Sequence, residues 1–181
     1  MPSDPLPQAR VRALQHVLDT YASEIAKTAS VWRRFADSDL RYRPHERSAT
    51  VEDNLRHEIL SARRFFGGFL GLDEPAADGL FPSEVSVASL TERMVQLAQP
   101  RLFVLADKDE AWWLERVSFF DVQRERVWIV WRRMMHSAHH RTQLTVYLRL
   151  LNKPVPAIYG PSNDESWVGA NPTTTVEAAK R

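Results

Sequence analysis

The sequence predicts an all-α protein, a four-helix bundle in which a long crossover joins the second helix to the third. Long windows without proline or glycine cover residues 8–43, 45–66 and 101–153, and such windows favour helix. Apolar residues recur within them every three or four positions, which is the spacing of one helical face. No segment carries a clear strand signal. Four long amphipathic helices of this kind are typical of an antiparallel bundle.

The first two helices have recognisable ends in the sequence. The first helix is expected to stop before Pro44, because the residue that precedes a proline avoids the α region. The second is expected to begin after Thr50, since Thr50 and Asp53 have the spacing of a capping box. Gly67, Gly68 and Gly71 should close the second helix, and residues 71–85 are then the crossover loop.

The second half of the chain should supply the other two helices. The third helix is predicted from Ser86 or Ser89, with a kink or break at Pro100. The fourth is predicted from Arg124 to Leu151, with Asp121 as its N-cap and Asn152 just beyond its end. Residues 107–121 show no clear period and receive no assignment. We therefore expect the bundle to occupy residues 1–159, followed by an irregular tail over residues 160–181.

Composition excludes several classes of protein. The chain has 181 residues, one domain's worth, and its formal net charge is +1, so nothing in it favours nucleic-acid binding. It has no apolar run of about 18 residues and no secretion signal at its start, which predicts a cytoplasmic protein without a membrane partner. Cysteine is absent, so any metal must be held by histidine, carboxylate or water.

Histidines carry the sharpest chemical signal in the sequence. His136 and His140 are four residues apart, so their side chains project from the same face of the fourth helix, one turn apart. Both interrupt an otherwise apolar stripe, whereas His139 points to one side of it. Two readings stay open at this point: the pair binds a metal ion, or each histidine is a hydrogen-bonded residue of the core.

Other polar side chains near these histidines are weaker candidates. His57 lies off the apolar line of its helix, which by itself favours an exposed side chain. Glu58 could act as a general base, but we expect it on a solvated face, together with Asp53. The arginines of the fourth helix, Arg132, Arg133 and Arg141, are expected to be exposed, and Gln143 could hydrogen-bond a histidine ligand or simply be solvated.

The chain resembles the DinB/YfiT-like family of metal-dependent four-helix bundles. The resemblance rests on three segments: Thr50-Val-Glu-Asp-Asn-Leu-Arg-His57, the His136-x-x-x-His140-Arg-x-Gln143 run, and the Val155-Pro-x-x-Tyr-Gly160 ending. Asn54 and Glu58 stand where the family usually has aliphatic residues, and Arg-Thr-Gln follows His140 in place of the common Arg-Gly-Gln. These departures imply a more polar pocket than is usual.

The resemblance implies a divalent metal ion, zinc or nickel, on His57, His136 and His140. It further implies an open coordination position and hence a hydrolase or a transferase that acts with a low-molecular-weight thiol. The alternative is a bundle that binds a metal or a small molecule without turnover, such as a sensor or stress protein. Elimination also leaves His57 as the third ligand, because His16 should be exposed, His45 follows a proline in a loop and His139 leans away.

We also expect a homodimer that acts on a small molecule. The fourth helix carries large apolar residues outside the histidine stripe, and one helix cannot bury them all against two neighbours; they are Trp128, Trp131, Met134 and Met135.

Overall fold

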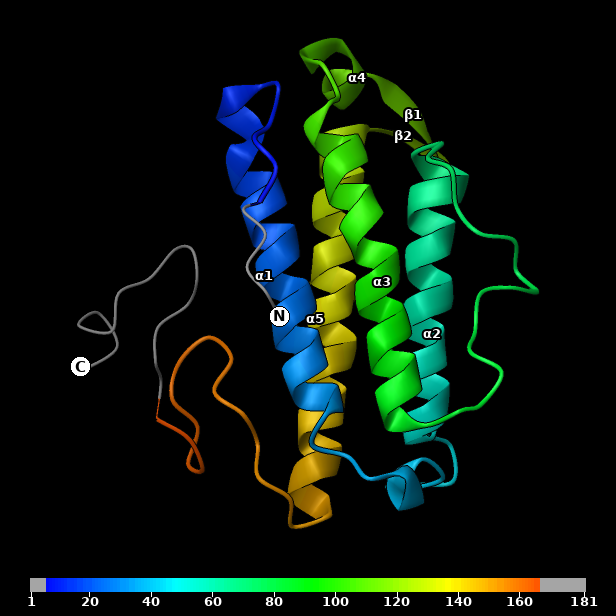
Figure 1. The fold of residues 1–181 in the computed structure, drawn as a ribbon, viewed down its shortest axis with the longest axis vertical. Coiled ribbons are helices and arrows are strands. Elements are labelled where there is room, and N and C mark those ends of the chain that lie inside the picture. Colours follow the sequence, from blue (N-terminus) through cyan, green and yellow to red (C-terminus); the bar gives the residue numbers. More distant parts are fainter. Residues whose placement is uncertain (1–5, 167–181) are drawn as a thin grey trace.

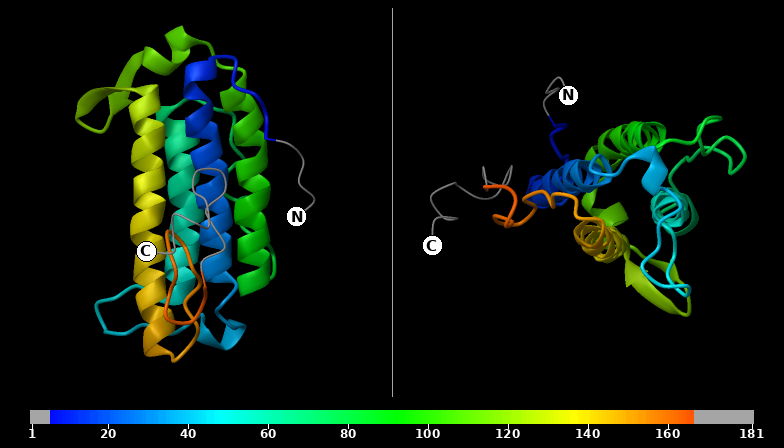
Figure 2. Two further views of the ribbon diagram at one scale, coloured as in Figure 1. Left: turned by 90° about the vertical axis from the view of Figure 1, so that its left-hand side faces the viewer. Right: turned by 90° about the horizontal axis from the view of Figure 1, so that it is seen from below.

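Four long helices form the protein, as the sequence predicts. A computed structural model describes residues 6–166. In it, α1 (Gln15–Trp32), α2 (Val51–Arg63), α3 (Val87–Ala106) and α5 (Arg126–Leu150) run side by side (Figure 1). Helices α1 and α2 each pack against both α3 and α5, so they occupy opposite corners of the bundle (Figure 2). In this arrangement α2 and α5 are neighbours and form one side of the bundle.

The first helix ends earlier than predicted. It stops at Trp32 rather than just before Pro44, and a short 3₁₀ turn follows at Asp37–Asp39. The Asp39 carboxylate accepts a hydrogen bond from the Ala36 amide at 2.6 Å, and Asp37 accepts one from the Val87 amide at 2.7 Å. Aspartate side chains that bind backbone amides favour turns over helix. The chain therefore leaves the helix well before the proline.

The capping box of α2 is confirmed. The Asp53 amide donates to the Thr50 hydroxyl, and the Thr50 amide donates to the Asp53 carboxylate, both at 3.1 Å. Beyond Arg63 the helix widens into a π-helical segment, Arg64–Phe69, before the chain turns at Gly71 with φ of +69°. Glycine adopts this left-handed conformation without the strain that a side chain would impose. The predicted crossover loop follows directly.

The third helix continues through Pro100, so of the predicted kink or break the break does not occur. It runs from Val87 to Ala106, with the Ser86 hydroxyl accepting a hydrogen bond from the Ser89 amide. Pro100 is exposed, whereas Leu97 and Leu102 on either side of it are buried. A proline costs about 3 kcal/mol inside a helix. Burial of the flanking leucines offsets that cost, so the helix continues.

The segment between α3 and α5 contains a β-hairpin that the sequence did not indicate. The short helix α4 (Glu110–Leu114) leads into strand β1 (Arg116–Phe119), which pairs antiparallel with β2 (Val122–Glu125). Phe120 turns the hairpin with φ of +53°, which is rare for a bulky side chain. Asp121 also lies in this turn and is not a cap: α5 begins at Arg126 after Glu125. At its other end, Asn152 has the expected left-handed conformation, with φ of +55°.

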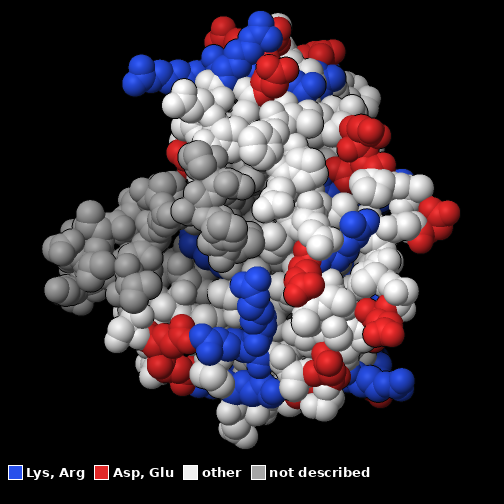
Figure 3. Space-filling model, viewed as in Figure 1, with Lys and Arg blue, Asp and Glu red and all other residues white. Residues whose placement is uncertain are grey.

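The chain after α5 is irregular and lies against α1 and α5. Its contacts include ion pairs from Arg34 to Glu165 and from Arg149 to Asp164. Of the predicted irregular tail, residues 167–181 lie outside the described part of the chain. On the face seen in Figure 3, acidic and basic side chains are interspersed. No helix among residues 6–166 is both long and apolar enough to span a bilayer.

Candidate metal centre

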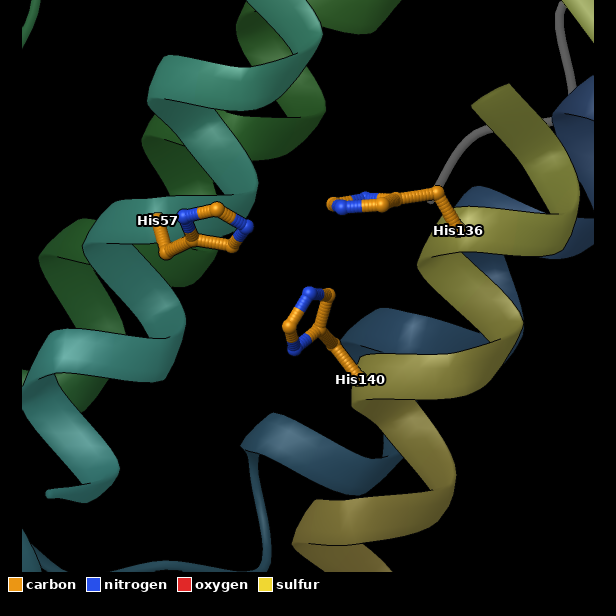
Figure 4. Close-up of side chains that lie close together, drawn as sticks. All are labelled: His57, His136 and His140. Atoms are coloured by element: carbon orange, nitrogen blue, oxygen red, sulfur yellow. The ribbon is translucent and has the colours of Figure 1, made fainter. Parts of the chain in front are cut away.

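Three histidine side chains from α2 and α5 converge at one point between these helices. His57 comes from α2, whereas His136 and His140 come from successive turns of α5 (Figure 4). Each offers a ring nitrogen, and these nitrogens lie within 4.8 Å of one another. The ring centroids are 4.6 Å apart for His57 and His140, and 5.3 Å apart for His57 and His136. The sequence-predicted set is therefore brought together, and the cluster could hold a metal ion.

The donor chemistry of the cluster fits a divalent transition metal. Zinc bonds imidazole nitrogens at about 2.0–2.1 Å, so nitrogens on one ion lie at most about 4.2 Å apart. The present spacing, within 4.8 Å, is close to that limit. Three protein nitrogens without a fourth side chain also leave a coordination position for water or substrate, which is the pattern of catalytic rather than structural zinc sites.

The position of His57 agrees with its place on the helical wheel and shows how an exposed residue can still join the cluster. The apolar line of α2 faces the bundle axis, whereas His57 lies on the flank that faces α5. His57 is exposed, as its place on the helical wheel indicates, and its ring points toward His136 and His140 (Figure 4). A flank position in a bundle can thus reach a neighbouring helix without being part of the core.

Electrostatics favour the neutral form of two of these rings. Partial burial lowers the pKa of His57, and the neighbouring His136 and Arg133 lower it further against the opposing effect of Glu58. Burial also lowers the pKa of His140, with His136 and His57 adding to the effect. Neutral imidazole is the form that binds metal ions. Burial and neighbouring charge thus shift His57 and His140 toward the form that binds a metal ion.

Hydrogen bonds orient the two rings of α5. His140 Nδ1 lies 2.9 Å from Gln143 Oε1, so Nδ1–H donates to the amide and Nε2 keeps its lone pair. His136 Nδ1 lies 3.3 Å from Glu58 Oε1 and 2.9 Å from Arg133 Nη1. These two contacts require opposite tautomers, because Arg133 can only donate. Donation from Nδ1–H to Glu58 is the one that frees Nε2 for a metal.

Glu58 is buried, which corrects the expectation of a solvated side chain. It is 2% exposed and accepts hydrogen bonds from Arg133 Nη2 at 3.1 Å and Ser137 Oγ at 2.7 Å. Burial by itself would raise the pKa of Glu58, but the charge of Arg133 and the hydrogen bonds from His136, Arg133 and Ser137 lower it well below its usual range. Glu58 is thus an ionised positioning residue behind His136.

Arg133 and Arg141 are also buried, contrary to expectation, while Arg132 is exposed. Arg133 pairs with Glu58, and Arg141 pairs with Glu24 of α1 at 2.6 Å. The Tyr159 hydroxyl completes the second group by donating to Glu24 at 2.6 Å. Glu24 follows Tyr21 by three positions and Val17 by seven, which places it on the buried face of α1, and its role was not predicted. The sequence did contain a signal for this pair: Glu24 is a charged residue on an otherwise apolar helix face, and Arg141 on another helix could balance its charge.

The remaining histidines stay outside the cluster. His16 stacks on Trp131 with ring centroids 6.0 Å apart, and His45 accepts a hydrogen bond from the Arg47 amide. His139 is exposed, and its ring centroid lies 5.0 Å from that of His140. Asp53, the other acidic candidate, belongs to the capping box of α2, where its carboxylate accepts a hydrogen bond from the Thr50 amide.

These features define a class of protein: a four-helix bundle with a three-histidine cluster, able to hold a metal, between its second and last long helices. The chain belongs to the DinB family, whose sequence profile matches residues 10–174. This confirms the family that the sequence resembles. Family and fold therefore agree, and the departures at Asn54 and Glu58 are buried polar residues in this chain.

Similar proteins support the same assignment. The chain is 25% identical over 160 residues to the uncharacterized protein YrdA of Bacillus subtilis, covering 85% of this chain and 92% of that protein. A crystal structure of a DinB-like protein from Bacillus cereus has a TM-score of 0.66 at 19% identity, covering 79% of this chain and 95% of the other. For the DinB-like protein YjoA of B. subtilis the TM-score is 0.64 at 18% identity, over 80% and 97% of the two chains. At these identities, the two structures establish the fold alone.

Proposed function

We propose that the protein is a metal-dependent enzyme whose divalent ion, zinc or nickel, is held by His57, His136 and His140. The observation that carries the proposal is the convergence of three ring nitrogens within 4.8 Å from two different helices. When bound, such an ion would acidify a water molecule or polarise a substrate thiol or carbonyl. The reaction classes that fit are hydrolysis and the transfer of a low-molecular-weight thiol, with a small molecule as substrate.

The side chains around the cluster have separate tasks in this proposal. Gln143 holds the His140 ring with Nε2 toward the cluster, and donation from His136 Nδ1–H to Glu58 would do the same for His136. Arg133 and Ser137 keep the Glu58 carboxylate charged and fixed in place. These residues bind and orient; none of them needs to react.

A second candidate function is metal or small-molecule binding without turnover, as in a sensor or stress protein. One observation favours it: Glu58, the acidic side chain next to the cluster, is held by Arg133 and Ser137 and is not free to take up a proton. An enzyme of this type would then depend on the metal-bound group or the substrate itself for proton transfer. Turnover assays with a panel of thiols and electrophiles separate the two functions.

Metal analysis of protein purified without a polyhistidine tag tests the site. We expect about one equivalent of divalent metal in the wild type, or uptake of one equivalent of added Zn²⁺ or Ni²⁺. His57→Ala, His136→Ala and His140→Ala should each lose most of it, since three ligands are the norm for such sites. His16→Ala and His139→Ala are matched controls that should retain it. Full retention of metal in His57→Ala would refute the assignment of the third ligand.

We further propose that the protein acts as a homodimer in the cytoplasm. Of the apolar residues expected outside the histidine stripe, Met134 is buried and Trp131 half-buried, whereas Trp128 and Met135 are exposed. With Val146 they form an exposed apolar stripe along α5, suited to pack against a second copy. Light scattering should give about twice the chain mass of 20.9 kDa. A monomer mass at micromolar concentration would contradict the dimer.

A further inference from the structure

We propose that Arg133 restrains metal binding at His136 and thereby sets how tightly the centre holds its ion. The inference rests on the proposed function, because it assumes that His57, His136 and His140 are the ligands. It adds a positioning residue that works against the metal: the Arg133 guanidinium favours the form of the His136 ring that cannot bind an ion. The Glu58 carboxylate favours the opposite form, so the two side chains compete.

Arg133 and Glu58 make opposite demands on His136 Nδ1. Arg133 Nη1 lies 2.9 Å from this nitrogen, and Glu58 Oε1 lies 3.3 Å from it. A guanidinium has donors only, so its contact forms when Nδ1 carries the lone pair, and the single proton of the uncharged ring is then on Nε2. A carboxylate accepts only, so it needs the proton on Nδ1. The Ser61 hydroxyl, 3.4 Å from Nδ1, can donate or accept and does not decide between the two forms.

Arg133 is fixed beside the ring by contacts that do not involve the ring. Its Nη2 donates to the Glu58 backbone carbonyl at 3.0 Å and to Glu58 Oε2 at 3.1 Å, and its guanidinium carbon lies 5.8 Å from the centre of the Phe65 ring. Nη1 is left with His136 Nδ1 at 2.9 Å and Glu58 Oε1 at 3.4 Å, so the histidine is its closer partner. A metal on His136 Nε2 would turn Nδ1 into a donor and remove that partner. Loss of this hydrogen bond is a cost that metal binding must overcome.

The other histidine of α5 is not opposed in this way. His140 Nδ1 lies 2.9 Å from Gln143 Oε1, an acceptor that leaves Nε2 free for a metal. The restraint therefore acts on one ligand of the three, through a side chain whose other contacts hold α2 to α5. This gives the inference a distinctive consequence: weakening the contact from Arg133 to His136 should strengthen metal binding, whereas damage to the fold would weaken it.

Arg133→Lys tests the inference, because lysine keeps the positive charge that the buried Glu58 requires but lacks the second nitrogen that contacts the ring. In competition with a chromophoric chelator, the variant should bind Zn²⁺ up to about tenfold tighter than the wild type, the equivalent of about one net hydrogen bond. Long-range proton–nitrogen correlation spectra of the metal-free protein at about pH 8 show which ring nitrogen carries the proton. The wild type should populate the Nε2–H form of His136, and the variant should shift toward the Nδ1–H form.

Arg141→Lys is the matched control. Arg141 is also a buried arginine of α5 that pairs with a glutamate, Glu24 at 2.6 Å, but its hydrogen bonds go to α1 and Tyr159. This variant should not tighten metal binding. The inference is overturned if Arg133→Lys binds Zn²⁺ no more tightly than the wild type, if Arg141→Lys tightens binding equally, or if wild-type His136 carries its proton on Nδ1 alone. If neither the wild type nor Arg133→Lys takes up Zn²⁺ or Ni²⁺, the proposed function itself fails and the inference fails with it.

Discussion

Replacing Glu58 by glutamine is the change that most directly tests the buried network behind the histidine cluster. The carboxylate is 2% exposed, and its arginine partner Arg133 is 4% exposed. Removing one charge of a buried ion pair leaves the other uncompensated and costs about 3–5 kcal/mol. Glutamine keeps the side-chain volume and one acceptor oxygen. We therefore expect a loss at the low end of this range, about 3 kcal/mol of unfolding free energy. For a chain of this length that is about 6–12 °C in Tm.

The same substitution should weaken metal binding. Without the carboxylate, His136 Nδ1–H loses the acceptor that lies 3.3 Å away, and the ring loses its preferred tautomer. Loss of such a supporting partner typically costs 10–100-fold in metal affinity. Competition with a chromophoric chelator measures the affinity, and urea denaturation of the metal-free protein measures stability. The two measurements separate the effect on the site from the effect on the fold.

Glu52→Gln is the internal control for this experiment. Glu52 also lies on α2 and also pairs with an arginine, Arg56, at 2.7 Å, but both side chains are about one-third exposed, at 33% and 31%. Exposed pairs of this kind contribute less than about 0.5 kcal/mol. The reasoning is refuted if Glu58→Gln costs no more stability than Glu52→Gln while leaving metal affinity unchanged.

Three further predictions concern the fold. Thr50→Ala should destabilise the protein by about 1 kcal/mol in urea denaturation through loss of the α2 cap, whereas Thr50→Ser should restore it. Gly71→Ala should cost about 1 kcal/mol because of the positive φ, and an unchanged urea midpoint would contradict this. Burial raises the pKa of Glu24, but Arg141 and the hydrogen bonds around it lower that pKa below 4.5 overall. Its stabilisation is therefore present above about pH 4.5 and lost as the pH falls further. The unfolding free energy of Glu24→Gln should then fall less on acidification than that of the wild type.

Local chemistry made part of the molecule predictable from sequence. The Thr50–Asp53 cap, the left-handed Asn152 and the turn of the chain at Gly71 are each decided by a few neighbouring residues, so the sequence indicates them directly. The same holds for His136 and His140, because a spacing of four residues fixes two side chains on one face of any helix. The four helices follow from windows without breakers and from apolar periodicity.

Other features depended on which residues meet across the bundle. Glu58 and Arg133 are separated by 75 positions, so no neighbouring residue of either one indicates that it is buried. Considered alone, each is predicted to be a solvated charged residue. The β-hairpin at 116–125 has no periodicity of its own in the sequence; its strands pair with each other and pack beside Phe65 and Phe69 of the π-helical segment that follows α2. The early end of α1 depends partly on Asp37, which binds an amide of α3.

His57 stands between these two cases. The sequence alone placed it on a helix and off the apolar face, and both statements hold. What the sequence could not specify is that the flank of α2 faces α5 at the level of His136 and His140, because that depends on how the two helices pack. Helical periodicity is a property of one segment, whereas a three-histidine cluster requires the relative position of two segments, and only the tertiary structure decides it.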